Sequence, residues 1–462
     1  MQSERKRDID KVIFNDYCIG CGACQVKNNV STEENEFGMY LPNVNYVDKL
    51  DGKVCPFSGE SPNELQLAPK IYSNPTVNNY SKHIGQYMDL FAGFVKSGNF
   101  RKNGTSGGMT KWLLSKLLET GQINGVIHVV RNNDPDQLFR YDISYSTEDV
   151  QMASQSAYYT VNFSKVLNEV INDESDKTYA FVGVPCYCKA IRAMSEQYPI
   201  LKDKIKFIFG IFCGHMKTKN YAKLMAWDAK LNPNKLKYVN FRKKGDKGKS
   251  SDYFFHGVDN KSESIEKRNN LFGGNYNIPH LKYKACDFCE DVFAYCADVV
   301  FGDAWLPKYV EDPQGTNVVI VRNREIKKTI DRFKNELKLD RLTANEVINS
   351  QSSSYSHRID EIGFRIYLNR KKKIWTPPKI SEERANLDNK GRERIQRLRI
   401  KIREISHPLF KEAIDRNDIN YYIKNIIKPI NSLNAKYKRS WSSKIFGYFK
   451  NKITLLRFLK HS

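Results

Sequence analysis

The sequence lacks the features that would place it in a membrane or in a secretory pathway. It has no run of about 18 uncharged apolar residues, which a membrane-spanning helix requires. Its first residues, MQSERKRDIDKVIF, are charged where a signal peptide has an apolar core. It also has no internal repeat and no low-complexity run. With 40% hydrophobic residues in 462, we therefore expect a globular protein of the cytoplasm.

The chain has only ten cysteines, and they are unevenly spread. Because the cytosol keeps thiols reduced, clustered cysteines are better interpreted as metal ligands or redox groups than as disulfides. Two tight groups are apparent: Cys18, Cys21 and Cys24, and then Cys286, Cys289 and Cys296. The other four are Cys55, Cys186, Cys188 and Cys213.

The first group has the C-x2-C-x2-C spacing of ferredoxins. Glycines at 20 and 22 let the backbone wrap closely around a bulky cluster with its amides directed at the sulfides. The fourth ligand of such a triplet is a remote cysteine before proline, and KVCPF supplies Cys55. We predict one [4Fe-4S] cluster, on Cys18, Cys21, Cys24 and Cys55. A structural zinc site is the alternative, although zinc sites usually show paired C-x2-C units.

The middle of the chain predicts alternating helices and strands, and therefore an α/β fold. Leucines at 113, 114, 117 and 118 recur at helical spacing, and Gly121 stands where a C-terminal cap belongs. The apolar run GVIHVV, at 125–130, predicts a buried strand. Further strands are predicted over 179–182 and just before Cys213.

The turn GTSGG, at 104–108, precedes the first of these helices. Its free amides and its two hydroxyls are suited to cradle a phosphate or a flavin pyrophosphate. A simple N-cap is the alternative, and the turn matches neither the P-loop nor the G-x-G-x-x-G pattern.

Thiol and polar side chains follow the next two strands. Cys186 and Cys188 lie at a helix start, where amides stabilise thiolates, and Cys213 follows a buried strand. Open α/β sheets bind ligands just beyond the carboxyl ends of their strands. Cys286 and Cys289 form a C-x2-C pair without a second pair, so two more thiolates must come from elsewhere.

We predict a second [4Fe-4S] cluster, on Cys186, Cys213, Cys286 and Cys289. Cys188 and Cys296 are rival ligands, and a zinc site or plain buried thiols are the alternatives to a cluster. His215 and Asp303, each just beyond a predicted strand, are candidate acid/base residues, although each also suits a purely structural role.

Seven stretches follow one another in a specific order: CIGCGAC with CP, TSGGMTKWLLSKLLETGQINGVI, SQSAYY, FVGVPC, IFCGH, CDFCEDVFAYCADVVFGDAW and GTNVVIV. Together they resemble the family of the beta subunit of coenzyme F420-reducing hydrogenases and dehydrogenases, over roughly residues 14–325. The resemblance implies an iron-sulfur flavoprotein, with FAD on an α/β domain and a ferredoxin-like N-terminal module. Relatives include deazaflavin-using hydrogenase subunits, chlorophyll-pathway reductases and bacterial proteins thought to serve polysaccharide synthesis.

The resemblance also assigns residues to these groups. The family's flavin-site turn matches Thr105, Ser106, Gly107 and Gly108. A segment beside the flavin contains Ser156 and Tyr158. The inner cysteine positions match Cys186, Cys213, Cys286 and Cys289. The deazaflavin F420 itself is a candidate substrate.

The C-terminal part of the chain is strongly basic. From Lys371 onward it has 24 Lys and Arg against 8 Asp and Glu, which gives +16 of the formal +23. Apolar residues recur at helical spacing in RERIQRLRIKIREI, at 392–405. WSSKIFGYFKNKITLLRFLK, at 441–460, resembles an interfacial helix, so we expect peripheral contact with anionic lipid at the inner membrane surface. A helix packed on its own protein is the alternative. No recognised motif accompanies the charge, so nucleic acid is not an expected partner.

We therefore predict three parts: a ferredoxin-like [4Fe-4S] module over 1–65, an α/β domain with FAD and the second cluster over 66–350, and a basic, mostly helical region over 351–462. The expected activity is an FAD- and [4Fe-4S]-dependent oxidoreductase. It would pass electrons from a ferredoxin-like donor through the clusters and FAD to a small-molecule substrate, in polysaccharide biosynthesis by the resemblance alone. The alternative is a non-catalytic electron-transfer or assembly subunit of a membrane-associated glycan-synthesis complex.

Overall fold

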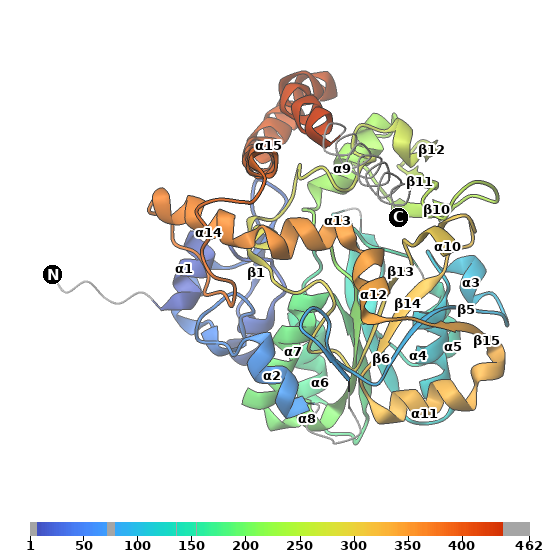
Figure 1. The fold of residues 1–462 in the computed structure, drawn as a ribbon. Helices are drawn as coiled ribbons and strands as arrows, with labels where there is room; N and C mark the ends of the chain where they lie inside the picture. Colours follow the sequence, from blue (N-terminus) through green and yellow to red (C-terminus); the bar gives the residue numbers. More distant parts are fainter. Residues whose placement is uncertain (1–6, 72–78, 135, 154, 438–462) are drawn as a thin grey trace, which may run out of the picture.

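The computed structural model describes residues 7–71, 79–134, 136–153 and 155–437. A mixed sheet of eight strands lies at its centre (Figure 1). In spatial order the strands are β15 (Leu337–Arg341), β5 (Asp89–Val95), β14 (Asn317–Val321), β13 (Val299–Asp303), β9 (Ile205–Ile211), β8 (Tyr179–Gly183), β6 (Gly125–Asp134) and β7 (Gln137–Ser144). The inner strands β13, β9, β8 and β6 run parallel to one another, and the outer strands pair antiparallel.

Helices cover both faces of this sheet (Figure 1). One face carries α4 (Met109–Glu119), α5 (Thr147–Met152) and α11 (Arg324–Arg332), and the other carries α6 (Ser164–Asn172), α7 (Pro185–Gln197) and α8 (Pro199–Lys204). Strand side chains alternate between the two layers: Phe207 and Phe209 of β9 pack in one core cluster, and Ile208 packs in the other. The sheet is therefore buried on both faces, as its apolar strands require.

The predicted α/β class is confirmed, and so are the predicted elements of the middle of the chain. The leucine pattern forms α4, in which Leu113, Leu114 and Leu117 are almost completely buried, and the helix ends just before Gly121. The run GVIHVV lies in β6, and the strand predicted over 179–182 is β8. The outer strands add antiparallel pairing that the βα alternation does not predict.

The N-terminal segment packs against α6 and α7. Its elements are α1 (Asp8–Phe14), η1 (Ala23–Asn28), β1 (Thr32–Glu34), β2 (Tyr40–Pro42), η2 (Val44–Lys49), η3 (Gly52–Val54) and α2 (Glu64–Ile71). The short 3-10 helices η1 and η3 both contact α7, and α2 lies against the same helix. This docking brings the first cysteine group beside the helix that carries Cys186.

The remaining elements lie mostly beyond one edge of the central sheet. They are the hairpin β3 (Asn79–Ser81) and β4 (Gly85–Tyr87), the three-stranded sheet of β10 (Tyr238–Lys244), β11 (Tyr253–Val258) and β12 (Glu263–Lys267), the short 3-10 helices η4 (Arg268–Asn270), η5 (Lys284–Phe288) and η6 (Lys334–Glu336), the π-helical turn η7 (Ser356–Asp360), and the helices α3 (Phe100–Asn103), α9 (Asn220–Asp228), α10 (Pro307–Val310), α12 (Ala344–Ser350), α13 (Ser352–Tyr355) and α14 (Ile362–Lys371). Of these, η5 contains Cys286 and η7 contains Arg358.

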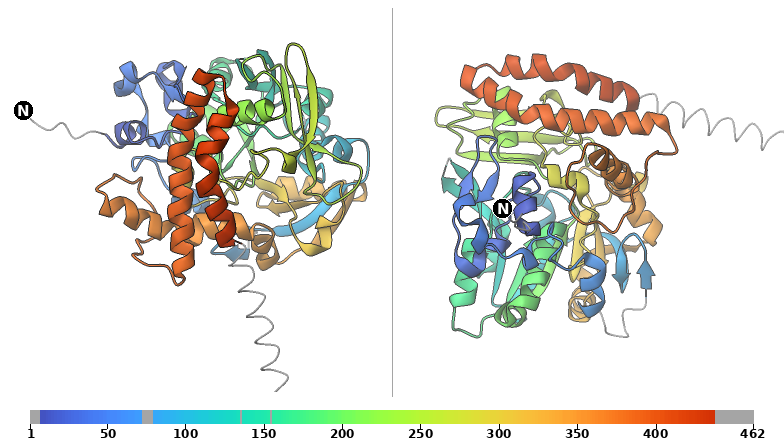
Figure 2. Two further views of the ribbon diagram at one scale, coloured as in Figure 1. Left: turned by 90° about the horizontal axis from the view of Figure 1, so that it is seen from above. Right: turned by 90° about the vertical axis from the view of Figure 1, so that its left-hand side faces the viewer.

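A long helix, α15 (Lys390–Arg416), and a second helix over 419–437 lie side by side along the body of the protein (Figure 2). Ile395 and Ile402 of α15 are fully buried, and Phe410 packs edge-on against Trp227 of α9. The helix predicted from the apolar spacing at 392–405 is therefore confirmed, and it packs on its own protein.

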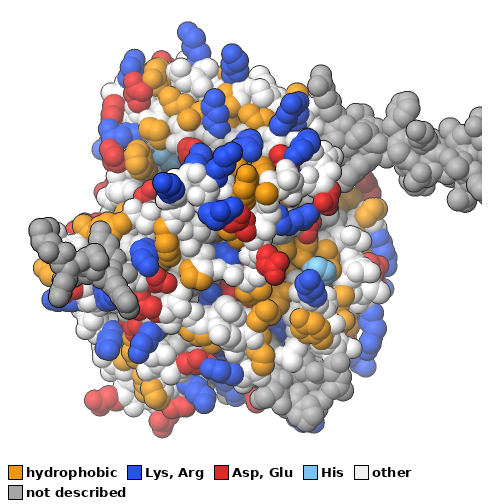
Figure 3. All heavy atoms as spheres, turned by 60° about the vertical axis from the view of Figure 1, so that its left-hand side comes forward, with side chains coloured by type: hydrophobic (Ala, Val, Ile, Leu, Met, Phe, Trp, Pro, Cys, Tyr) orange, Lys and Arg blue, Asp and Glu red, His pale blue; other side chains and the backbone are white. Residues whose placement is uncertain are grey.

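The stretch at 441–460, on which the predicted lipid contact depends, lies outside the described residues. Within the described ranges, no helix is both long enough and apolar enough to cross a bilayer. On the face drawn in Figure 3, Lys and Arg side chains are interspersed with acidic and hydrophobic ones.

Arg322, directly after β14, ties the central sheet to the loop that follows the Cys286 and Cys289 pair. It is 1% exposed, and its guanidinium donates hydrogen bonds to five backbone carbonyls. The acceptors are the carbonyl oxygens of Ile84 (2.8 Å), Gln86 (2.9 Å), Phe293 (3.1 Å), Ala294 (3.0 Å) and Ala297 (3.2 Å). One side chain thus bonds to three carbonyls of the loop over 293–297 and to two of the hairpin segment over 84–86.

Replacing Arg322 with Met should lower the free energy of unfolding by about 3 kcal/mol or more, because several buried carbonyls lose their donor at once. Urea unfolding followed by circular dichroism measures this loss. The control is Arg324→Met at the exposed start of α11, which should change stability by about 0.5 kcal/mol or less. Equal losses in the two variants would contradict the role assigned to Arg322.

Candidate iron-sulfur and flavin sites

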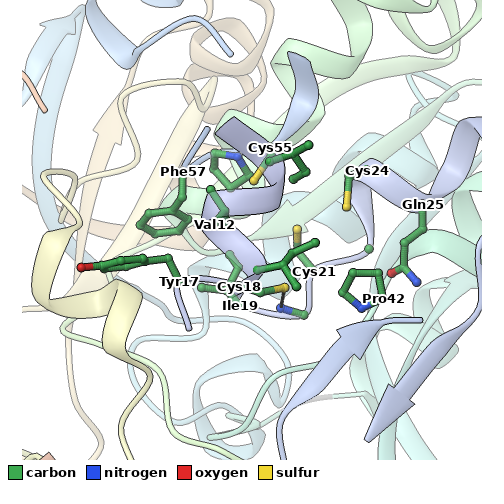
Figure 4. Close-up of a pocket in the computed structure, with 15 residues that line it drawn as sticks. Val12, Tyr17, Cys18, Ile19, Cys21, Cys24, Gln25, Pro42, Cys55 and Phe57 are labelled. Atoms are coloured by element: carbon green, nitrogen blue, oxygen red, sulfur yellow. Dashed lines mark hydrogen bonds between the residues drawn. The ribbon is translucent and has the colours of Figure 1, made fainter. Parts of the chain in front are cut away.

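The four cysteines of the predicted N-terminal cluster line one cavity (Figure 4). Cys18 and Cys21 lie on the loop that enters η1, Cys24 lies within η1, and Cys55 follows η3. Figure 4 shows their sulfur atoms turned toward the same space. Apolar side chains from α1 and from the segment after Cys55 line the rest of it. We call these four residues the outer cysteine group.

The loop of the outer cysteine group depends on glycine. Gly20 has φ +67°, and a Cβ atom there would lie 2.5 Å from the carbonyl oxygen of Tyr40. Its amide N–H donates to the Sγ atom of Cys18 at 3.4 Å. The close wrapping of the backbone and the amide directed at sulfur are therefore both present, as ferredoxin spacing predicts.

Burial makes these thiols weak acids. It raises the pKa of Cys18 to about 12 and that of Cys55 to about 11. It also raises the pKa of Cys24 well above its usual value, and the three neighbouring thiols add to that increase. Four such thiols would not ionise together near neutral pH without a cation between them. The donor set therefore fits a metal centre that displaces the thiol protons.

A second group of cysteines meets at the carboxyl ends of β8 and β9. It consists of Cys186 in the first turn of α7, Cys213 after β9, Cys286 in η5, and Cys289 at the end of η5. Burial raises the pKa of Cys186, and Cys289, Cys213 and Cys286 raise it further, in that order. The amide N–H of Met216 donates to Cys286 Sγ at 3.2 Å. We call these four residues the inner cysteine group; their role as ligands stays a prediction.

The two rival cysteines have different surroundings. The Cys188 thiol donates to the carbonyl oxygen of Gly183 at 3.4 Å, within the turn that joins β8 to α7. Burial raises the pKa of Cys296, and the nearby carboxylates of Glu64 and Asp291 raise it further. Both cysteines are completely buried. Whether either of them replaces a member of the inner group stays a prediction.

The two cysteine groups are neighbours. Burial raises the pKa of Tyr187, and the next influences include Cys21 from the outer group and Cys186 from the inner group. Cys21 also contributes to the raised pKa of Cys186. Because charges shift each other's pKa chiefly at close range, the two groups lie near each other at the start of α7.

Zinc and a four-iron cluster place their cysteine ligands differently. Cysteine sulfurs around a zinc ion each lie about 2.3 Å from it. In the part of the chain that the structure describes, no three His, Cys, Asp or Glu side chains come together closely enough to hold one metal ion. A four-iron cube is larger than an ion and keeps its ligands farther apart, and the choice between a cluster and zinc stays a prediction.

The predicted flavin turn has a structural role of its own. Ser106 Oγ donates to the carbonyl oxygen of Thr316 at 2.9 Å, and a Cβ atom on Gly107 would lie 2.5 Å from the carbonyl oxygen of Gly93. The first amide of α4 donates to Asn317 Oδ1 at 3.1 Å, and neither hydroxyl of the turn caps the helix. Gly108 of the turn is the N-cap of α4, as the N-cap alternative expects, and Gly107 is needed whether or not a flavin binds.

His215 and Tyr158 belong to one aromatic stack. The His215 ring lies parallel to that of Tyr276, at an interplanar angle of 4° and with centroids 4.5 Å apart, and Tyr158 lies 4.5 Å from the same ring. Burial lowers the pKa of His215 well below its usual value, and Lys217 and Lys282 lower it further. The ring is therefore neutral, and among the described residues its Nε2 atom has no hydrogen-bond partner. This arrangement suits a packing role.

Asp303 has a different environment, at the carboxyl end of β13. Its carboxylate forms an ion pair of 2.9 Å with Arg242 of β10. Arg242 also lies over the ring of Tyr253, 4.2 Å from its centroid. The structure thus joins Asp303 to a cation that the sequence motifs do not reveal.

Ser156, the other residue predicted beside the flavin, is half-buried in the loop before Tyr158.

Two buried arginines near the site were not predicted. Arg242 pairs with Asp303, and Arg358 bonds to the loops of the inner cysteine group. Both lie far in sequence from the residues that they contact, and no spacing or motif marks them. Buried cations beside a cysteine loop are recognised only when the fold is known.

Comparison with protein families gives two matches, both to the beta subunit of coenzyme F420 hydrogenase/dehydrogenase. Residues 90–168 match the model of its N-terminal part, and residues 176–346 match the model of its C-terminal part. Together they cover more than half of the chain.

A search of curated proteins found no significant match. Among solved structures, the chain resembles one from the F420-reducing [NiFe] hydrogenase complex of Methanosarcina barkeri. The sequence identity is 16% and the TM-score 0.48, over 66% of this chain and 98% of that chain. With two consecutive family models matched in order, the chain belongs to the coenzyme F420 hydrogenase/dehydrogenase beta subunit family.

Proposed function

We propose that this protein is an FAD- and [4Fe-4S]-dependent oxidoreductase that passes electrons from a ferredoxin-like donor to a small-molecule substrate. The family description names hydrogenases and dehydrogenases, so oxidoreductase chemistry is its activity class. The observation that carries the finer proposal is the presence of two neighbouring groups of four cysteines, all buried or half-buried. When bound, clusters transfer single electrons and FAD combines two of them for hydride transfer, which clusters alone do not perform.

Each cysteine group would have its own part in this arrangement. Cys18 is half-buried, whereas the other three outer cysteines are buried, so the outer group offers the approach for an external donor. The inner group lies at the edge of the sheet where β8 and β9 end. Asp303, at the end of the neighbouring strand β13, pairs in register with Asn317, which bonds to the start of α4 after the flavin turn. Electrons would thus pass from the donor through the clusters to a flavin at the carboxyl ends of these strands.

The three predicted parts are retained in this proposal, with 1–65 as the ferredoxin-like module, 66–350 as the flavin and inner-cluster domain, and 351–462 as the basic region. The third part is bound to the second. Arg365 of α14 donates to the carbonyl oxygen of Asp287, and Arg403 of α15 pairs with its carboxylate at 2.7 Å. We infer that the basic region covers the inner cysteine group and would not function as a detached tail.

A second candidate is a non-catalytic electron-transfer or assembly subunit, which would need the clusters and no flavin. This candidate stays open because contacts within the protein explain why Ser106 and Gly107 occur in the 104–108 turn without a bound flavin. Iron, acid-labile sulfide and flavin per chain, measured on anaerobically purified protein, separate the two. About eight irons with one FAD support the reductase, and about four irons without flavin support the alternative.

The inner cysteine assignment is tested by Cys286→Ala. This variant should lose about four of eight irons while it keeps the outer cluster and part of its flavin, because three thiolates rarely retain a four-iron cluster. Iron and sulfide analysis gives the result. The matched control is Cys188→Ala, a buried cysteine whose thiol bonds to Gly183, and it should keep all its iron. Full iron in the Cys286 variant would remove Cys286 from the ligand set.

The flavin assignment is tested by Thr105→Val, since Gly107 cannot be enlarged without displacing Gly93. Loss of one hydroxyl should weaken flavin binding about fivefold, as expected for a hydrogen bond of about 1 kcal/mol. Titration of the flavin-free protein, followed by flavin fluorescence, measures the dissociation constant. Thr178→Val, next to the amino end of β8, is the control that should bind flavin normally. Equal flavin affinity in the two variants would mean that the flavin does not bind at the turn.

A further inference from the structure

Arg358 is a buried cation that lies against the inner cysteine group. It is 4% exposed and belongs to η7, a single π-helical turn between α13 and α14. Turns of this kind are rare and are frequently found at functional sites. The residue also lies beyond the family match that ends at residue 346, so it belongs to the C-terminal part of this chain.

The guanidinium of Arg358 connects the two loops that carry inner cysteines. It donates to the carbonyl oxygens of Cys213 and of Gly214 (3.3 Å) on the loop after β9. It also donates to the carbonyl oxygens of Cys289 (3.5 Å) and Asp291 (2.8 Å) on the loop after η5. A planar group with five donors can span two loops in this way, whereas a lysine ammonium cannot.

The charge of Arg358 acts on the same cysteines. Burial opposes that charge, but Cys289, Cys213 and Cys286 raise the pKa of Arg358 above its usual value. In return, burial raises the pKa of Cys213 to about 12, and Arg358 is the largest opposing influence. The arginine and the sulfurs therefore face each other across a short distance in a medium of low dielectric constant.

Arg358 forms no direct ion pair with a carboxylate. Among the described residues, no Asp or Glu lies within ion-pair distance of its guanidinium, and its Nε atom has no hydrogen-bond partner. Another cation near Cys286, Lys282, is paired with the carboxylate of Asp287. Asp291 bonds through its carboxylate to the backbone amides of Phe293 and Tyr295, and it raises the pKa of Arg358 less than the three cysteines do. The positive charge of Arg358 thus acts mainly on the cysteine group.

We infer that Arg358 is a positioning residue for the inner cysteine group, which fixes the loops of Cys213 and Cys289 and favours the reduced, more negative state of a cluster held there. This inference rests on the proposed inner cluster. Reduction by one electron adds one negative charge to the site, and a buried cation beside it stabilises that charge. The C-terminal part of the chain therefore tunes the redox step that the family-matched part carries out.

The test is the midpoint potential of each cluster, measured by anaerobic redox titration of the full-length protein with electron paramagnetic resonance detection. Arg358→Gln should shift the inner potential to a more negative value by at least a tenfold change in the reduction equilibrium, or about 59 mV for a one-electron couple. Its iron content and the outer potential should be unchanged. Arg358→Lys, which keeps the charge, should stay near the wild-type potential. Arg392→Gln, which removes a cation that pairs with Glu361, should leave both potentials unchanged.

An unchanged inner potential in the iron-replete Arg358→Gln protein would overturn the inference. If that variant loses iron, the Arg358→Lys variant decides. Retained iron at a potential near wild type supports a role for the charge. Loss of iron in both variants would mean that Arg358 only supports the loops, and it would overturn the inference. About four irons in the wild-type protein would overturn the inner cluster itself, and the inference with it. Iron analysis of the wild type thus distinguishes failure of the proposed function from failure of the role of Arg358.

Discussion

A thiolate removed from water is unstable unless positive charge lies beside it, and this protein places eight buried or half-buried cysteines in two neighbouring groups. Burial is the largest cause that raises the pKa of Cys18 and Cys213 to about 12, so neither group would hold its charge near neutral pH without a cation. Metal ions supply such charge by displacing thiol protons. The arrangement of the chain around the two groups fits this need to exclude water from the sulfur ligands.

Three separate parts of the chain build that enclosure. The N-terminal segment brings the outer group against α7, and α7 begins with Cys186 of the inner group. The loops after β9 and in η5 bring the other inner cysteines to the same edge of the sheet. The C-terminal helices then close it, through Arg403 to Asp287 and through Arg358 to the loop carbonyls. The basic region is thus part of the site's architecture, in addition to any surface role that its charge provides.

The candidate flavin site shows how a motif can have two explanations. In the 104–108 turn, Gly107 is required because β5 passes within 2.5 Å of the position of its missing side chain. Ser106 is already bonded to Thr316, so the motif identifies the family without proving contact with a ligand. The same holds for His215, whose ring packs on Tyr276, and for Asp303, which pairs with Arg242. His215 and Asp303 lie at the carboxyl ends of β9 and β13, and the local contacts of each explain its presence without a ligand.

The sequence by itself determined the α/β class, the elements of the middle of the chain and the family, because hydrophobic period and cysteine spacing are local properties. At the start of α7, the sequence left Cys186 and Cys188 as rival ligands. Residues two apart on a helix point about 200° from each other, so Cys186 and Cys188 would not serve one cluster together. Only the tertiary structure decided which of them faces Cys213, Cys286 and Cys289, because that depends on how α7 docks on the sheet. It alone revealed Arg358 and Arg242, since contacts across more than 60 residues leave no periodic or spacing signal in the chain.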